Sequence, residues 1–325
     1  MPDLDSLSIL FVWTAIAIYA AAFVAYAFDL ARRSEVTADA RLARETALVG
    51  AGGADASGAA EVAASAEPAK PRYVMARIGT TLTGLAFMFH LAATVLRGIA
   101  AERVPWANLY EFAMIGTLLV VLVYLVVLTR IDLRFLGTFI TGLIVVLMGA
   151  AAVSFYVGVV PLMDPLKSVW LVIHVFVASL GTAFFALTAA LSILQLMQHR
   201  RERRIAEEIE KPGPRFLATL PGSERLEGLA FRFAIVGFIL WTFTLIAGSI
   251  WAQDAWGRYW GFDVKETWTF IIWVLYAGYI HARATRGWRG SRSAWLSIIG
   301  FTAVIFNFTI VNVFFKGLHA YSGLS

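Results

Sequence analysis

Eight long apolar runs dominate the 325-residue sequence, and short segments between them carry most of its charged residues. A helix needs about 20 mostly apolar residues to cross the hydrocarbon core of a bilayer. The predicted spans are residues 7–28, 76–96, 109–128, 135–154, 169–196, 229–250, 268–282 and 295–315. Apolar residues make up 59% of the chain and charged residues 15%, against roughly half and a quarter in soluble domains. The pattern predicts an all-α polytopic membrane helix bundle with about eight transmembrane helices.

Lysine and arginine are divided unevenly between the two sets of connecting segments. Alternate segments hold 21 of these residues on one side of the bundle and six on the other. Cytoplasmic loops carry the excess of Lys and Arg, so we expect both termini on the extracytoplasmic side. The first run ends in Arg32-Arg33 and lacks a basic leader, which favours a retained span over a cleaved signal.

The chain divides into three predicted parts. Residues 1–30 form the first transmembrane helix, 31–74 a cytoplasmic flexible linker, and 75–325 the membrane core. Within the linker, residues 46–69 are rich in Gly, Ala and Ser, a composition typical of flexible segments. A charged stretch from His199 to Lys211 continues the fifth helix until Pro212 stops it, and His199 is expected at the surface.

Two features of the composition exclude whole classes of function. The chain has no cysteine, which excludes disulfides, thiol redox chemistry and Cys-ligated metal sites. The net charge of +5 is divided between the apolar runs rather than gathered in one basic patch. Nucleic-acid binding is therefore not indicated.

The segment at residues 251–268, on the predicted outer side, is rich in aromatic residues. Trp251, Trp256, Tyr259 and Trp260 recur at four- and five-residue steps and would form one face if the segment were helical. Such a segment would lie along the membrane interface. Together with Phe262, these side chains favour a binding surface for a large, planar, apolar ligand.

Two structural explanations compete with this binding surface. An ordinary interfacial aromatic belt explains any single Trp and accounts for Trp106 and Trp170. Asp263 and Glu266 form a capping-box pattern ahead of the seventh span, and carboxylates suit the positive end of a helix. Capping does not exclude a part in shaping a ligand site.

Four histidines lie in or beside the predicted spans. His174 and His319 are expected near the outer side, His281 at the cytoplasmic end of the seventh span, and His90 within the second span. Each can be a hydrogen-bonded structural residue, and for His90 that interpretation is favoured. Ionisable residues inside a bilayer are nevertheless functional candidates, and imidazoles are common ligands of metals, including haem iron. The spacings match no zinc or di-iron motif, so a metal held by a porphyrin fits the aromatic surroundings better.

The run from Trp256 to Trp268 resembles the tryptophan-rich WWD signature of haem-handling proteins. From about residue 75 the chain is similar to the CcsA/ResC (CcsB-type) family of system II cytochrome c biogenesis. Other stretches agree in the same order, namely Pro105–Glu111, Trp170–His174, Tyr279–His281 and Leu318–Tyr321. The family usually has Trp where Phe262 stands and Pro where Val264 stands. Phe keeps the aromatic face but lacks the indole N–H.

The resemblance implies haem b as a transported substrate and covalent haem attachment to the CxxCH motif of apocytochrome c. His174 and His319 would be axial ligands of the iron at the outer face of the plasma membrane, and His281 an inner haem site. A ResB/Ccs1-type membrane subunit would complete the cytochrome c synthase (haem lyase), and no catalytic residue is assigned beyond haem positioning. The implied haem-contacting residues are His174, His319, His281, Trp251, Trp256, Tyr259, Trp260, Phe262, Asp263, Glu266 and Arg258.

The haem propionates would need cationic partners on the outer side. Arg258 is the first choice because it lies within the aromatic run, ahead of Lys265, Arg103 and Arg97. Two other functions remain open at this stage. One is a haem relay that delivers haem to a chaperone without attaching it, as the shorter CcmC proteins do. The other is a transporter or scaffold in which the aromatic residues form a belt and the histidines are structural.

Overall fold

The computed structural model describes residues 3–50, 74–159, 167–209, 213–285, 288–315 and 317–318, with the backbone alone for 34–50. Throughout these ranges the regular structure is helical. The helices are α1 (Leu4–Gly50), α3 (Val74–Ala101), α4 (Leu109–Leu128), α5 (Gly137–Ser154), α6 (Val169–Ala206), α7 (Ser223–Trp256), α8 (Val264–Ala284), α9 (Ser291–Phe308) and α10 (Ile310–Phe314). Two short 3-10 helices, η1 (Arg134–Leu136) and η3 (Arg215–Thr219), lie in the connections.

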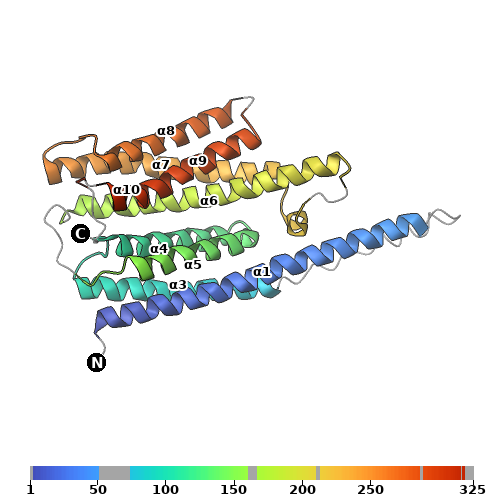
Figure 1. Cartoon of the computed structure of the whole chain (residues 1–325), viewed down its shortest axis with the longest axis horizontal. Coiled ribbons are helices and arrows are strands. Elements are labelled where there is room, and N and C mark those ends of the chain that lie inside the picture. Colours follow the sequence, from blue (N-terminus) through green and yellow to red (C-terminus); the bar gives the residue numbers. More distant parts are fainter. Residues whose placement is uncertain are drawn as a thin grey trace.

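The helices confirm the prediction of a polytopic membrane bundle. In the described residues, seven helical segments are long and apolar enough to cross a membrane. Helix α8 contains the predicted run 268–282 but is not among the seven, since Lys265, Glu266 and Arg283 lower its mean hydropathy. It nevertheless runs beside α7 and α9 in the same bundle (Figure 1).

Two predicted boundaries fall elsewhere in the structure. Helix α1 continues to Gly50, so the first part of the predicted linker 31–74 is helical, and residues 51–73 lie outside the described ranges. Helix α6 extends into the charged stretch, as predicted, but it ends at Ala206 rather than at Lys211.

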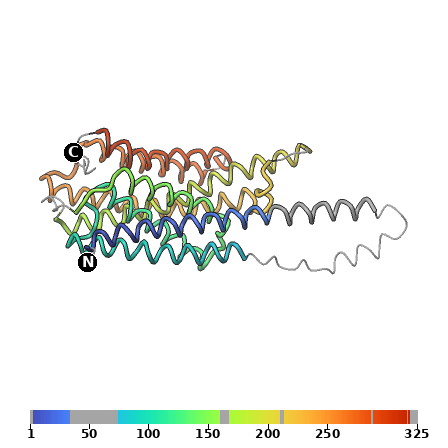
Figure 2. Tube along the Cα trace, turned by 60° about the horizontal axis from the view of Figure 1, so that its bottom comes forward, coloured from blue at the N-terminus to red at the C-terminus, as the bar shows by residue number. Residues whose placement is uncertain are grey.

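Two groups of helices pack against each other along the bundle. Helix α1 lies along α3, with α4 and α5 beside them, while α6 to α10 form the other group (Figures 1 and 2). The largest buried cluster joins the groups, with Tyr19, Tyr124 and Leu136 on one side and Leu187 on the other. A second cluster lies within α6 to α9, where the rings of Phe185 and Tyr276 stack at 3.5 Å.

The chain alternates between the two ends of this bundle. Helices α1, α4, α6 and α8 begin at the end where α7 and α10 finish (left in Figure 1). We call this the pocket end, and the opposite one the far end. Successive long helices run in opposite directions, as expected for a polytopic bundle. The aromatic segment and the start of α6 therefore come together at the pocket end. Which side of a membrane the pocket end faces remains a prediction.

Candidate functional site

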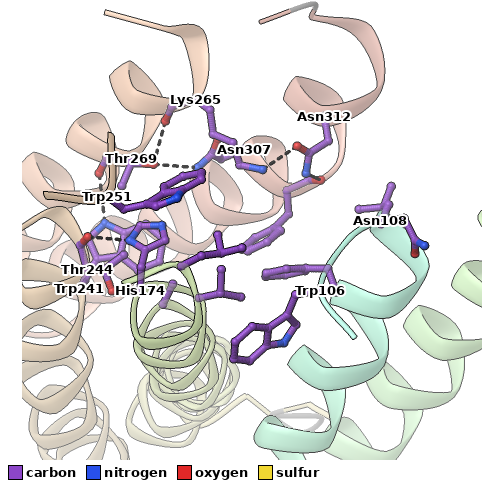
Figure 3. A pocket seen from close by; sticks show the side chains of 16 residues that line it. Trp106, Asn108, His174, Trp241, Thr244, Trp251, Lys265, Thr269, Asn307 and Asn312 are labelled. Atoms are coloured by element: carbon purple, nitrogen blue, oxygen red, sulfur yellow. Dashed lines mark hydrogen bonds between the residues drawn. The ribbon is translucent and has the colours of Figure 1, made fainter. Parts of the chain in front are cut away.

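A pocket of about 110 Å³ lies at the pocket end, where α4 meets α6 to α10 (Figure 3). The lining is largely apolar and aromatic, and the polar groups come from the five helices α6 to α10 and from the N-cap of α4. Its residues are Trp106, Asn108, Leu109, Phe112, Leu171, His174, Val175, Ala178, Trp241, Thr244, Trp251, Lys265, Thr269, Asn307, Phe308 and Asn312.

His174 lies in this pocket in a fixed tautomer. Its Nδ1 lies 3.0 Å from the carbonyl oxygen of Thr244 on α7. A carbonyl oxygen only accepts, so Nδ1 carries the proton and donates it, and the lone pair is on Nε2. Histidines that bind metals through Nε2 are held in the same way, by donating the other ring N–H to a carbonyl or carboxylate.

The imidazole of His174 also packs closely against α7. Its ring stacks on the indole of Trp251 with centroids 6.0 Å apart and an angle of 28°. At Gly248 an added Cβ would lie 2.7 Å from Cε1 of His174, closer than side chains approach. The glycine is therefore required for the ring to lie against the helix backbone.

A second pocket, of about 70 Å³, shares His174, Thr244, Lys265 and Thr269 with the first. Tyr259 and Trp260 line it from the loop between α7 and α8. The imidazole thus stands at a wall common to both cavities. Trp251 of the 251–268 segment stacks on His174, and two further aromatic residues of that segment line the second pocket.

The continuous helical face expected for the aromatic segment is wrong. Helix α7 ends at Trp256, because Gly257 adopts a left-handed conformation with φ 68°, a common way for a helix to terminate. Trp256 packs on Trp251 at 4.9 Å, whereas Tyr259 and Phe262 lie in the following loop and are 63% and 80% exposed. The exposed rings are therefore available at the surface beside the pocket.

The capping box predicted at the start of α8 is confirmed. Asp263 is the N-cap, and the Glu266 carboxylate accepts the backbone N–H of Asp263 at 3.1 Å and that of Gly261 at 2.8 Å. Glu266 also accepts a hydrogen bond from Arg258 at 3.1 Å. These bonds fold the loop over the first turn of α8.

Three of the four predicted propionate partners are already paired. Arg97 is fully buried and bonds to Glu111 and Asp5, and Arg103 bonds to Glu111 at 2.7 Å. Arg258 is held by Glu266 as described above. Arg258 as a propionate partner stays a prediction, and Lys265 is the one of the four that lines both pockets around His174.

The other histidines fall into three groups. His90 is completely buried, with Nε2 2.8 Å from the carbonyl of Met114 and Nδ1 3.4 Å from the hydroxyl of Tyr19. It is therefore a hydrogen-bonded core residue, as favoured from its position. His281 is exposed near the far end of α8, and His199 is exposed beyond the last span residues of α6. His319 lies outside the described residues, so the pairing with His174 stays a prediction.

Sequence reasoning missed several polar residues of the pocket. Trp106, assigned to an interfacial belt, lines the pocket instead. Its Nε1, Nδ2 of Asn108 and Oδ1 of Asn307 are buried and have no hydrogen-bond partner among the described residues. Buried polar atoms are normally satisfied. The signal for Asn307 and Asn312 was available, because both are polar residues within the last predicted span.

The fold and the pocket define a multi-pass helical membrane protein with a histidine held in an aromatic cavity. The family model for the cytochrome C assembly protein matches residues 106–319, more than half of the chain. The chain belongs to this family, and its relatives group it with the CcsA proteins of system II cytochrome c biogenesis.

Three relatives illustrate the similarity, each described as "Cytochrome c biogenesis protein CcsA". The protein of Heterosigma akashiwo is 32% identical over 249 residues, covering 68% of this chain and 77% of its own. That of Guillardia theta is 34% identical over 243 residues, covering 70% and 80%. That of Mesostigma viride is 33% identical over 264 residues, covering 73% and 84%.

One solved structure shares the fold. "Cytochrome c Heme Lyase CcmF" superposes with a TM-score of 0.59 at 16% identity, over 95% of this chain and 47% of that chain. The chain therefore corresponds to about half of the longer protein. At this identity the likeness is one of fold.

Proposed function

We propose that the chain holds haem b in the pocket beside His174 and presents its vinyl edge to the CxxCH motif of apocytochrome c. It would act together with a ResB/Ccs1-type membrane subunit. The pocket end would face the extracytoplasmic side of the plasma membrane, as the distribution of Lys and Arg predicts. Haem is the substrate of this process and leaves with the product.

The observation that carries this proposal is the hydrogen bond from Nδ1 of His174 to the Thr244 carbonyl, at 3.0 Å. It fixes the ring with Nδ1 toward α7 and leaves Nε2 as the ligating nitrogen, in the tautomer that binds iron. In a bundle interior a neutral imidazole held this way is suited to ligation. A histidine with a purely structural role would not need to line two cavities with aromatic walls.

The chemistry of the pocket lining suits a planar macrocycle as well as an imidazole ligand. The pocket is lined by Trp251, Trp241 and Trp106, whose flat rings can lie against a porphyrin. Tyr259 and Trp260 line the adjoining pocket. We infer that His319, on the chain just beyond α10, supplies the second axial ligand from the same end of the bundle.

The contribution of the chain to the reaction would be orientation rather than acid–base chemistry. Each cysteine thiol of the apocytochrome adds across one vinyl group, so that sulfur bonds to the α-carbon and the proton ends on the β-carbon. The two axial imidazoles would fix the iron and the indoles the ring plane. The histidine of CxxCH would then replace one ligand and allow release.

A second haem position is proposed at His281. Its side chain is exposed near the far end of α8, about 20 Å along the helix from Trp268. An exposed imidazole on the bundle surface suits a haem shared with another subunit. We propose that haem arriving from the cytoplasmic side is first received here, with the second ligand from the partner.

The test is co-expression of the chain, a ResB/Ccs1-type partner and a CxxCH reporter in a strain without maturation genes. Covalent haem on the reporter, lost in His174→Ala and retained in His199→Ala, supports the synthase. His199 is the matched control because it is exposed and far from the pocket. Haem bound to the chain without reporter attachment identifies a relay. Reporter haem unchanged in His174→Ala would overturn the assignment.

A further inference from the structure

We propose that Lys265 binds a carboxylate edge of the tetrapyrrole, and so sets which edge of the ring faces out of the pocket. This inference rests on the proposed function, because it assigns an additional contact within the same site. The propionates and the vinyl groups lie on opposite edges of haem. A carboxylate held at Lys265 on α8 therefore directs the vinyl edge away from α8.

Lys265 is the charged residue of the larger pocket. No Asp, Glu or Arg is among the described side chains that line this cavity. Lys265 also lines the smaller pocket, where Glu266 is paired with Arg258. A dianionic ligand in either cavity meets the same ammonium group.

The ammonium group is held by a neutral partner. Its Nζ donates to Oδ1 of Asn312 at 2.6 Å, and the amide of Asn312 is oriented by its own bond to the carbonyl of Phe308 at 2.7 Å. Among the described ion pairs Lys265 has no carboxylate partner, although Asp263, two residues earlier, acts on its charge through space. Two of its three N–H donors remain available for a ligand.

The pocket also contains polar groups that suit a carboxylate ligand. Nδ2 of Asn108 is a buried donor with no partner among the described residues, and so is Nε1 of Trp106. Donors left unsatisfied in a cavity favour a ligand rich in acceptor atoms. Haem supplies four such oxygens on its propionates.

Arg258 does not compete for this role. Its guanidinium bonds to both oxygens of Glu266, at 3.1 and 3.4 Å, and packs over the ring of Trp256 at 5.8 Å. It does not line either of the two pockets around His174. Arg203, which is 69% exposed on the charged extension of α6, supplies the control for loss of a positive charge.

The experiment compares two probes with the full-length chain in detergent, namely ferric haem and its propionate dimethyl ester. The wild-type chain should bind haem about 10- to 100-fold more tightly than the diester, the ratio expected for a charge-assisted hydrogen bond. Lys265→Gln should bind both probes equally, and Lys265→Arg should keep the preference. Asn312→Asp, which places a carboxylate against Lys265, should also remove the preference. Arg203→Gln should bind as the wild type does.

The outcomes separate the two proposals. Binding of both probes with His174 ligation but with equal affinity, or a preference that survives in folded Lys265→Gln and Asn312→Asp, overturns the role of Lys265 and leaves the haem site intact. If the wild-type chain binds neither probe, the proposed function itself is contradicted. Circular dichroism and gel filtration verify folding, and Asn312→Asp decides the matter if Lys265→Gln is unfolded.

Discussion

His174 on α6 donates its Nδ1 proton to the backbone carbonyl of Thr244 on α7, at 3.0 Å. The same imidazole stacks on Trp251, seven residues further along α7. One helix therefore fixes both the tautomer of the ring and its plane. The functional prediction for α7 is that it positions a ligand histidine carried by its neighbour.

Gly248→Ala tests this positioning without removing any functional group. The new Cβ would lie 2.7 Å from Cε1 of His174, so the ring must shift away from Thr244. We expect the haem content of the purified protein to fall severalfold and its α band on reduction to weaken. The measurement is haem per protein together with the reduced absorption spectrum.

Gly228→Ala is the matched control, since it lies on the same helix and a Cβ there meets no atom within 4 Å. Both substitutions gain about 1 kcal/mol of intrinsic helix propensity, so helix stability does not distinguish them. Equal haem content in the two variants would show that the close packing at Gly248 has no part in ligation.

The buried position of His90 predicts an effect on stability. His90→Leu leaves the Tyr19 hydroxyl without its partner and removes the bond to the Met114 carbonyl. The free energy of unfolding should fall by about 1–3 kcal/mol, measured by chemical denaturation in detergent, with unchanged haem bands in the folded fraction. Loss of those bands from folded protein would make His90 a ligand, contrary to its hydrogen bonding.

Arg97 stabilises the turn that carries two residues of the pocket lining. It bonds to Glu111, whose carboxylate accepts the backbone N–H of Ala107 at 2.8 Å, within the turn that carries Trp106 and Asn108. Arg97→Met should destabilise the protein by about 3–5 kcal/mol, as for other broken buried pairs, and should weaken haem binding.

The control for Arg97 is Arg134→Met, which breaks an exposed pair with Asp132 (28% and 57% exposed). Exposed pairs contribute at most about 1 kcal/mol. Thermal unfolding of the two variants in the same detergent measures the difference. Similar small losses in both would mean that the Arg97 pair is not a structural support of the pocket.

His281 gives a prediction that concerns only the uptake of haem from the cytoplasmic side. Its side chain is exposed on α8, so His281→Ala should leave stability within about 0.5 kcal/mol of the wild type. If it receives haem from the cytoplasmic side, the variant purified with its partner should contain less haem. Haem content equal to that of His199→Ala would make His281 a surface residue without a role in transport.

The fold could be predicted further than the site. All eight apolar runs lie in helices, because a run of that length has few other ways to satisfy its backbone in a membrane. The capping box at Asp263 and Glu266 was equally readable, since its hydrogen bonds are local. Local hydrogen bonds and long apolar runs can both be predicted directly from a sequence.

The site depends on contacts between distant segments, and these were predicted only in part. Trp106 resembled a belt residue because it lies at the end of a predicted span. The packing of Phe112 on α4 against Phe308 on α9 is not visible in the sequence. Arg258 was preferred over Lys265 because the aromatic run contains it, whereas its bond to Glu266 appears only in three dimensions. The spacing of the aromatic residues suggested a helix through Trp260. The structure ends α7 at Trp256, because Gly257 is left-handed.

The central claim is that His174 is a ligand of haem iron. The most direct measurement is the reduced absorption spectrum of the His174→Ala variant, purified with its partner from haem-replete cells, before and after addition of imidazole. We predict that the sharp α and β bands of bis-histidine haem are lost and then partly return as imidazole fills the vacated position. Sharp bands of wild-type intensity in the variant without imidazole would contradict the claim.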